Sequence, residues 1–462
     1  MVNKLCMKME ITNHPSKLVK PSKPTPPILR NYTISFIDEL APTNKIPLIL
    51  YYYAPPDFSP QKPHNKTICD HLEASLSETL CEFYPFAGRY TRYIALVDCS
   101  DQGVPYVLAN TNVPLSKILG GLGRGFKPDL LNDFLPCEIG ETKDGDDPML
   151  SIKVTTFGCG GLAIGMCFSH RIIDVATLCT FINNWVSRSK RVYEVKKYSP
   201  VFNSTLYFPP KDLPKLYLGP LRPSISAHVF RFNRDAIFAM GKTVGYGGTM
   251  SQSPSKVQLV VALLWKAFVR IDKANNGQSK ASFIAQPIEL RKKLDPQLPT
   301  NSFGNFWGLI TSQLKPGKGE NIGFQGFYKI LSDSVKKANT DCSKIAKHGE
   351  EGHHVIIDSY LESNRNVVDD DVNFYLFTSL CYFSFYKADF GWGKPVWASQ
   401  GKYPIQNLVV MMDDQEGGGV EAWVHLNEKC MRELEQDSDI KKYNNTSFSQ
   451  GKNTNTGIRS KI

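Results

Sequence analysis

The 462-residue sequence lacks several features that would assign it to common functional classes. No apolar run approaches the roughly 18 residues that suggest a membrane-spanning helix, and the first residues contain no apolar stretch long enough for a signal peptide. The eleven cysteines are scattered and never form a Cys-x-x-Cys pair. Scattered cysteines within apolar patterns are typical of free thiols in a reducing compartment. We therefore expect a cytoplasmic protein with no metal site and no membrane partner.

Motifs of several familiar active sites are also missing. The sequence contains no G-x-S-x-G elbow, no Walker loop and no H-E-x-x-H pair. The glycine-rich stretch 120–125 looks like a phosphate loop, but Phe126 or Pro128 occupies the third glycine position, which favours a flexible loop. His353 and His354 lie in a polar, glycine-containing stretch, 344–354, without a carboxylate pattern. That stretch predicts an exposed loop rather than a metal site.

The sequence has an excess of positive charge, but the basic residues do not form a cluster. The formal net charge is +10, with lysine and arginine spread along the chain. A spread surplus argues weakly for an anionic ligand and against a nucleic-acid-binding stripe, and solubility alone would also explain it. Hydrophobic residues make up 42% and charged residues 21%, which is ordinary for a globular protein.

Length and proline content predict two domains, because one hydrophobic core rarely serves so long a chain. Strand and helix patterns alternate along the first part of the sequence, fail between Lys190 and Pro223 where six prolines occur, and resume at Ala227. The residues after Asp437 are polar and carry no apolar pattern. We expect a first domain over 1–205, a crossover loop over 206–223, a second domain over 224–436 and a disordered tail over 437–462.

The most informative residues are His170 and Asp174. They lie between an apolar strand-like run, 162–168, and a helix-like run that begins at Val175. A histidine at the end of a strand is held rigidly, and imidazole has an unperturbed pKa suited to proton abstraction near neutral pH. The pattern indicates that His170 is a general base, with a hydrogen-bonded turn histidine as the simpler alternative.

A second unusual cluster runs from Asp389 to Pro395. Gly391 and Gly393 flank Trp392, which indicates a tight backbone anchored by an indole ring. A rigid structural turn would explain this cluster equally well.

Together, His-x-x-x-Asp and Asp-Phe-Gly-Trp-Gly resemble the BAHD acyltransferases, coenzyme-A-dependent plant enzymes that acylate alcohols and amines of specialised metabolism. Within that family the sequence is most similar to the vinorine synthase-like branch of alkaloid acetyltransferases, which commonly lacks the glycine that many relatives have in place of Val175. Further matches follow in family order from residue 20 to about 430, including Phe83–Arg89, Leu290–Arg291, Phe303–Asn305 and Gly419–Trp423.

The resemblance implies a fold and a reaction. The fold is two similar-sized α/β domains like those of chloramphenicol acetyltransferase, each a mixed sheet flanked by helices, with the active-site channel between them and a segment at about 391–412 crossing back to the first domain. The expected reaction is acetyl transfer from acetyl-CoA to a hydroxyl of an alkaloid or terpenoid, in a ternary complex, by a monomer without a permanently bound cofactor. A malonyl-CoA or other acyl-CoA donor, and a non-catalytic metabolite-binding relative, remain as alternatives.

The resemblance also implies roles for individual residues. It favours a structural ion pair between Asp174 and Arg291, with a carboxylate that orients His170 as the alternative. Relatives often carry a tryptophan whose indole N–H reaches the developing oxyanion, but the matching residue here is Leu380. Thr378 or a backbone amide is therefore expected to stabilise the oxyanion.

Two further sets of residues are expected around the channel. Ser255 and Lys256 begin the long helix of the second domain, where they would suit the phosphates or the pantetheine arm of CoA. An ordinary helix cap is the alternative. Asp389 and Trp392 are expected to shape the channel wall without taking part in catalysis.

Overall fold

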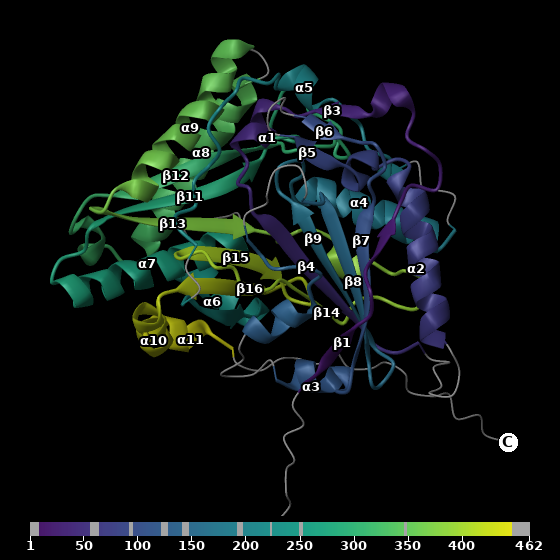
Figure 1. The fold of residues 1–462 in the computed structure, drawn as a ribbon. Helices are drawn as coiled ribbons and strands as arrows, with labels where there is room; N and C mark the ends of the chain where they lie inside the picture. The colour runs from purple at the N-terminus through teal and green to yellow at the C-terminus, as the bar shows by residue number, and fades with distance from the viewer. Residues whose placement is uncertain are drawn as a thin grey trace, which may run out of the picture.

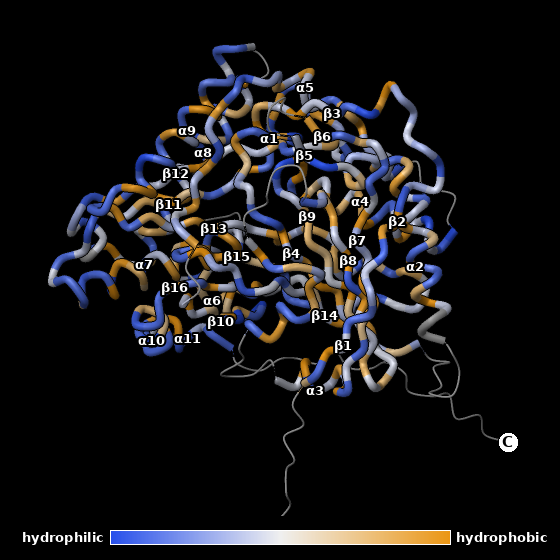
Figure 2. The backbone as a smooth tube through the Cα atoms, viewed as in Figure 1, coloured by the Kyte–Doolittle hydropathy of each residue, from blue (hydrophilic) through white to orange (hydrophobic). Residues whose placement is uncertain are grey.

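The computed structural model describes residues 9–55, 64–91, 96–121, 128–140, 147–191, 197–221, 224–248, 253–345 and 349–445. The chain forms two α/β halves that lie side by side, each built on one large sheet (Figure 1). This architecture confirms the predicted fold class. Apolar residues concentrate along the strands of both sheets, whereas the outer helices α8 (Phe324–Ile345) and α9 (Glu350–Val368) carry many hydrophilic residues (Figure 2).

The first half is organised around a seven-stranded sheet in the order β1-β7-β8-β9-β4-β14, with β2 also paired to β7. Its strands are β1 (Ile11–Asn13), β2 (Lys17–Val19), β4 (Lys45–Tyr52), β7 (Val104–Thr111), β8 (Leu150–Phe157), β9 (Leu162–Ser169) and β14 (Trp397–Ser399). The helices α2 (His64–Leu80) and α4 (Val175–Ser189) pack together beside this sheet, and the indole N–H of Trp185 donates to the carbonyl of Leu72 at 3.1 Å.

Smaller elements complete the first half. A three-stranded sheet has the order β3-β6-β5. These elements are β3 (Asn31–Thr33), β5 (Arg89–Thr91), β6 (Leu96–Asp98), α1 (Phe36–Leu40), α3 (Leu115–Gly120) and α5 (Ser204–Tyr207). Most of the glycine-rich stretch 120–125 lies outside the described residues.

The second half is organised around a six-stranded mixed sheet in the order β10-β16-β15-β13-β11-β12. Its strands are β10 (Ser226–Phe232), β11 (Ala281–Glu289), β12 (Trp307–Leu314), β13 (Val372–Ser379), β15 (Leu408–Asp413) and β16 (Val420–Leu426). Besides α8 and α9, it contains α6 (Arg234–Thr243), α7 (Lys256–Asn276), α10 (Glu428–Gln436) and α11 (Ser438–Tyr443). The apolar side chains of α7, including Trp265, form much of the second core.

Strand β14 connects the two halves. It follows β13 in the sequence but pairs antiparallel with β4 of the first sheet, where Trp397 stacks on Tyr51 with ring centroids 5.1 Å apart. The chain then returns to the second sheet at Leu408, the first residue of β15. The predicted crossing segment, 391–412, is therefore too long at its C-terminal end, because tertiary strand pairing decides where the crossing ends.

Two segments predicted to lack regular structure are helical. His353 lies in α9 rather than in an exposed loop, and its ring packs against Phe36 at a centroid distance of 4.9 Å. The predicted tail is wrong over 437–445, since α11 buries Ile440 and Tyr443 in the second core. Both segments have few apolar residues, so their helical character depends on packing against the rest of the chain. Residues 446–462 lie outside the described part.

Two general findings apply to the described ranges. Within them, no helix combines the length and the apolar composition needed to cross a bilayer, and no three or more metal-ligating side chains gather in one place. The ten cysteines that can be placed are free thiols.

Candidate active site

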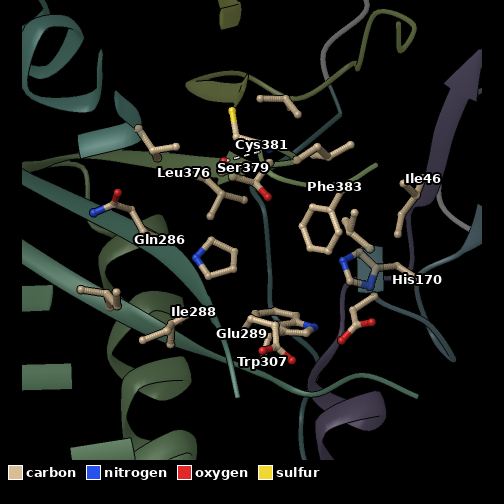
Figure 3. Close-up of a pocket in the computed structure, with 18 of the residues that line it drawn as sticks. Ile46, His170, Gln286, Ile288, Glu289, Trp307, Leu376, Ser379, Cys381 and Phe383 are labelled. Carbon is tan, nitrogen blue, oxygen red and sulfur yellow. Dashed lines mark hydrogen bonds between the residues drawn. The ribbon is translucent and has the colours of Figure 1, made fainter. Parts of the chain in front are cut away.

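A cavity of about 500 Å³ lies between the two halves (Figure 3). The first half supplies the end of β9, the start of α4 and the segment that leads into β4. The second half supplies residues of β11, β12, β13 and β15 and the start of α7. Most of the wall is apolar, which is typical of small-molecule sites with a few polar groups that orient the ligand. The apolar lining includes Ile46, Ile288, Ile310, Leu376, Leu408 and Val410.

His170 directly follows β9 and contributes its ring to the cavity wall. Its backbone N–H donates to the carbonyl of Asn44 at 3.2 Å, and its own carbonyl accepts from Asn305 Nδ2 at 2.8 Å. The ring lies 5.7 Å from that of Trp307, measured between centroids. Residues of both halves therefore fix the position of His170. Its place at the end of a strand predicted only the contribution of the first half.

The protonation of His170 suits a base. Its Nδ1 is buried and has no hydrogen-bond partner among the described residues. Burial lowers the pKa of His170 below its ordinary value of 6.5, although the nearby Asp174 carboxylate opposes the shift. The ring is therefore neutral at physiological pH, which is the form that accepts a proton.

Asp174 points into a set of donors rather than toward the imidazole. As the N-cap of α4, its Oδ1 accepts from the backbone N–H of Thr177 at 2.9 Å and from Arg291 Nη2 at 3.1 Å. Its Oδ2 accepts from Arg291 Nη1 at 2.7 Å and from the N–H of Phe306 at 3.0 Å. Burial would raise the pKa of the Asp174 carboxyl, but the Arg291 charge and the four hydrogen bonds together lower it. This geometry supports the structural interpretation of Asp174.

Arg291 joins α4 to the loop that precedes β12. Its side chain is 1% exposed, and it also donates to the carbonyls of Ser302 at 2.9 Å and Gly304 at 3.0 Å and to Glu289 at 3.1 Å. Each guanidinium nitrogen has an acceptor, which is the arrangement a buried arginine requires.

The Asp389–Gly393 cluster lies away from the cavity. Asp389 Oδ1 accepts the backbone N–H groups of Gly391 and Gly393, each at 2.9 Å, and its Oδ2 pairs with Lys190 at 3.0 Å. Both glycines have φ near +120°, a region that side-chain-bearing residues rarely adopt. Trp392 packs on Tyr52 at a centroid distance of 6.0 Å.

None of these described residues lines the cavity, so the channel-wall role of Asp389 and Trp392 stays a prediction. The cluster instead ties the turn before β14 to the end of α4, where Lys190 is the C-cap. A turn of this kind is needed because the chain must reach β4 in the other half.

Ser255 and Lys256 differ in their surroundings. Ser255 lines the cavity and makes no side-chain cap to α7. The Lys256 ammonium contacts Asp413 at 2.7 Å and the carbonyls of Gly417 and Gly419 at 2.8 and 3.1 Å. An ammonium has three donors, so these contacts leave none for a phosphate. The structure therefore does not support Lys256 as a CoA ligand.

Thr378 and Leu380 both line the cavity, at the end of β13 and directly after it. Leu380 is buried and offers no hydrogen-bond donor in its side chain. The hydroxyls of Thr378 and of the adjacent Ser379 are donors on this part of the wall.

Sequence reasoning missed the amide side chains at the cavity, of which Asn44 and Gln286 have an unpaired nitrogen within the described part of the chain. They are 8% and 7% exposed, both line the cavity, and the nitrogen of each amide has no partner among the described residues. A glutamine inside the apolar run 283–288 was a signal that could have identified Gln286. For Asn44 we find no such signal, because only its contact with His170 distinguishes it.

Comparisons with known proteins agree with this geometry. The model of a family described as "Transferase family" matches residues 9–440. A malonyltransferase of Salvia splendens that acts on a pelargonidin glucoside is 34% identical over 94% of this chain and 99% of its own. Vinorine synthase of Rauvolfia serpentina is 32% identical over 90% of this chain and 94% of its own. The crystal structure of vinorine synthase superposes with a TM-score of 0.79 at 30% identity, covering 95% of this chain and 99% of that one.

Proposed function

The chain belongs to the BAHD family of acyl-CoA-dependent acyltransferases, and we propose that it transfers an acetyl group from acetyl-CoA to a hydroxyl of an alkaloid or terpenoid. One observation carries the proposal: His170, whose pKa is lowered by burial, lines an apolar cavity to which both halves of the chain contribute. Such a cavity suits a bulky acceptor, and the two-sided wall allows a thioester and a hydroxyl to meet at one ring.

In the proposed mechanism His170 acts twice. The imidazole first accepts the proton of the acceptor hydroxyl as the oxygen attacks the thioester carbonyl, giving a tetrahedral intermediate. When the carbon–sulfur bond breaks, the imidazolium returns this proton to the CoA thiolate. General base catalysis of this kind contributes roughly 10²–10⁴-fold in rate. Attack is direct, so no acyl-enzyme forms.

The developing oxyanion needs a donor, and we assign this role to the Thr378 hydroxyl. Leu380 cannot provide it, and Thr378 lies two residues away on the same wall. Removal of one such donor costs about 10²–10³ in turnover in other enzymes. We assign Asp174 a positioning role, because its two oxygens are occupied by Arg291 and by backbone donors at the start of α4. In contrast to Thr378, it is not expected to touch the substrates.

A malonyl donor is the second candidate, since one relative at 34% identity is named as a malonyltransferase. A malonyl carboxylate needs a cation in the cavity. Among the described lining residues there is no arginine, and the cations are Lys45 and Lys293. Lys45 already pairs with Asp147 at 3.4 Å. Lys293 is then the lining cation that a malonyl carboxylate would contact. The cytoplasmic location and the monomeric state stay predictions from the sequence.

The test is to incubate the purified protein with labelled acetyl-CoA or malonyl-CoA and a panel of polycyclic alcohols. Acetylated product that is lost in His170→Ala is expected. His228→Ala is the matched control, because His228 lies in β10 and pairs with Glu435 at 2.7 Å. Equal turnover in wild type and His170→Ala would refute the mechanism, and preferred transfer of malonyl would select the second candidate.

A further inference from the structure

Gln286 lies in the middle of β11, opposite Ile310 of β12, with its side chain at the cavity. It is 7% exposed, and its Nε2 has no hydrogen-bond partner among the described residues. Buried polar groups in folded proteins nearly always have a partner, and an unpaired donor is unfavourable. The terminal torsion of a glutamine is broad, so the amide can turn its donor toward a ligand in the cavity. A ligand that offers an acceptor there would satisfy this group.

The surroundings of Gln286 are apolar. Ile288 lies two residues along the same strand, and Leu376 is on the neighbouring strand β13. Figure 3 shows Gln286 and His170 on opposite sides of the cavity. A ligand that contacts both residues therefore has a hydroxyl at one end, an apolar body, and a hydrogen-bond-accepting oxygen at the other end.

The apolar lining restricts this oxygen further. Glu289 also lines the cavity, but its carboxylate is already bound by Arg291 at 3.1 Å. A neutral carbonyl oxygen accepts from an amide N–H without bringing a charge into an apolar cavity. Asn44, the other described lining residue whose amide nitrogen is unpaired, is bound through its backbone to His170 and so lies at the reacting end. Within the described ranges, Asn339 lacks a partner only at its amide oxygen, which is an acceptor.

We propose that Gln286 binds a carbonyl oxygen of the acceptor, as in a ketone, ester or lactone, remote from the hydroxyl that is acylated. This inference rests on the proposed function and deepens it, because it defines the acceptor as a polycyclic alcohol that also carries a carbonyl group. Gln286 is then a residue that determines acceptor specificity and has no part in proton transfer.

The test uses matched pairs of polycyclic alcohols that differ only in a ketone, beginning with 17β-hydroxy-5α-androstan-3-one and 5α-androstan-17β-ol. In the wild type, kcat/KM for acetyl transfer is expected to favour the ketone about tenfold, which corresponds to one net hydrogen bond. In Gln286→Leu this preference should disappear through KM, while KM for acetyl-CoA stays unchanged. Gln258→Leu is the control, because Gln258 also lines the cavity, from α7. It should keep the preference.

Binding of the same pairs, measured as thermal stabilisation, decides the inference independently of turnover. No ketone preference in wild type, or an equal preference in Gln286→Leu, would overturn the role of Gln286. A ketone preference in binding that depends on Gln286, without acetyl transfer to any alcohol, would instead refute the proposed function alone.

Discussion

Arg291 Nη1 lies 2.7 Å from Asp174 Oδ2, in a buried ion pair that joins the helix after His170 to the second half of the molecule. The two residues come from different halves, and the cavity lies between those halves. Because Asp174 also caps α4, the pair holds the backbone that leaves His170. The active-site geometry and the stability of the fold therefore depend on the same contact.

Breaking this pair should destabilise the protein strongly. Asp174→Ala leaves the Arg291 guanidinium buried without its main counter-charge, which costs about 3–5 kcal/mol in comparable cases. The measurement is thermal and urea unfolding. Glu289→Gln is the control, since Glu289 also contacts Arg291 but its side chain is 32% exposed, and such pairs contribute at most about 1 kcal/mol. A stable Asp174→Ala protein with a shifted pH profile would indicate an orienting carboxylate instead.

The pH dependence of activity should report the His170 imidazole. Its pKa is lowered by burial, so the neutral base persists below pH 6.5 and is lost only as the pH falls through the lower, folded-state value. The acid limb of kcat/KM against pH should therefore have its midpoint below 6.5. A midpoint at or above this value would mean that the ring is not held in a desolvating environment.

The free energy of unfolding should decrease as the pH is lowered, for a related reason. The folded-state pKa values of His170 and Asp174 both lie below their ordinary values of 6.5 and 3.8. The stability contributed by each group is present above its unfolded pKa and is lost as the pH falls through its folded pKa. Thermal unfolding between pH 7 and 3 should show a decline on the acid side that Asp174→Asn reduces. An unchanged acid-side decline in Asp174→Asn would exclude this carboxyl as a source.

The oxyanion assignment predicts a loss in turnover rather than in binding. Thr378→Val removes the hydroxyl with little change in shape, and kcat should fall about 10²-fold because one donor to the oxyanion is lost. Thr378→Ser keeps the hydroxyl and should retain most of the rate. Leu380→Trp should raise the rate if the indole N–H adds a donor. Full activity in Thr378→Val would move the role to a backbone amide.

The glycines of the 389–393 turn should affect stability and not substrate binding. Gly391→Ala places a Cβ at φ +121°, which costs about 1–3 kcal/mol for a backbone conformation that residues with side chains rarely adopt. KM for both substrates should stay unchanged, because the turn does not line the cavity. Gly120→Ala is the control, since Gly120 is equally open to a Cβ but lacks a positive φ. A raised KM in Gly391→Ala alone would show that the turn reaches the site.

Local residue patterns were sufficient for some features of the site. His170 at the end of an apolar strand, the helix beginning at Val175 and the tight turn around Trp392 all depend on near neighbours in sequence, where periodicity and backbone preference are informative. Patterns failed for His353 and for the residues after Asp437, because helices with few apolar residues are stabilised by partners elsewhere in the chain.

The sequence by itself determined the proposed base, His170, the strand and helix that flank it, and the two-domain α/β class. Only the tertiary structure decided that the Lys256 ammonium contacts Asp413 and two glycine carbonyls, that the Asp389 turn does not line the cavity, and that Gln286 and His170 lie on opposite sides of it. The physical reason is that hydrogen bonds and cavities are formed by groups that approach in space. Here those groups come from strands and loops far apart in the chain.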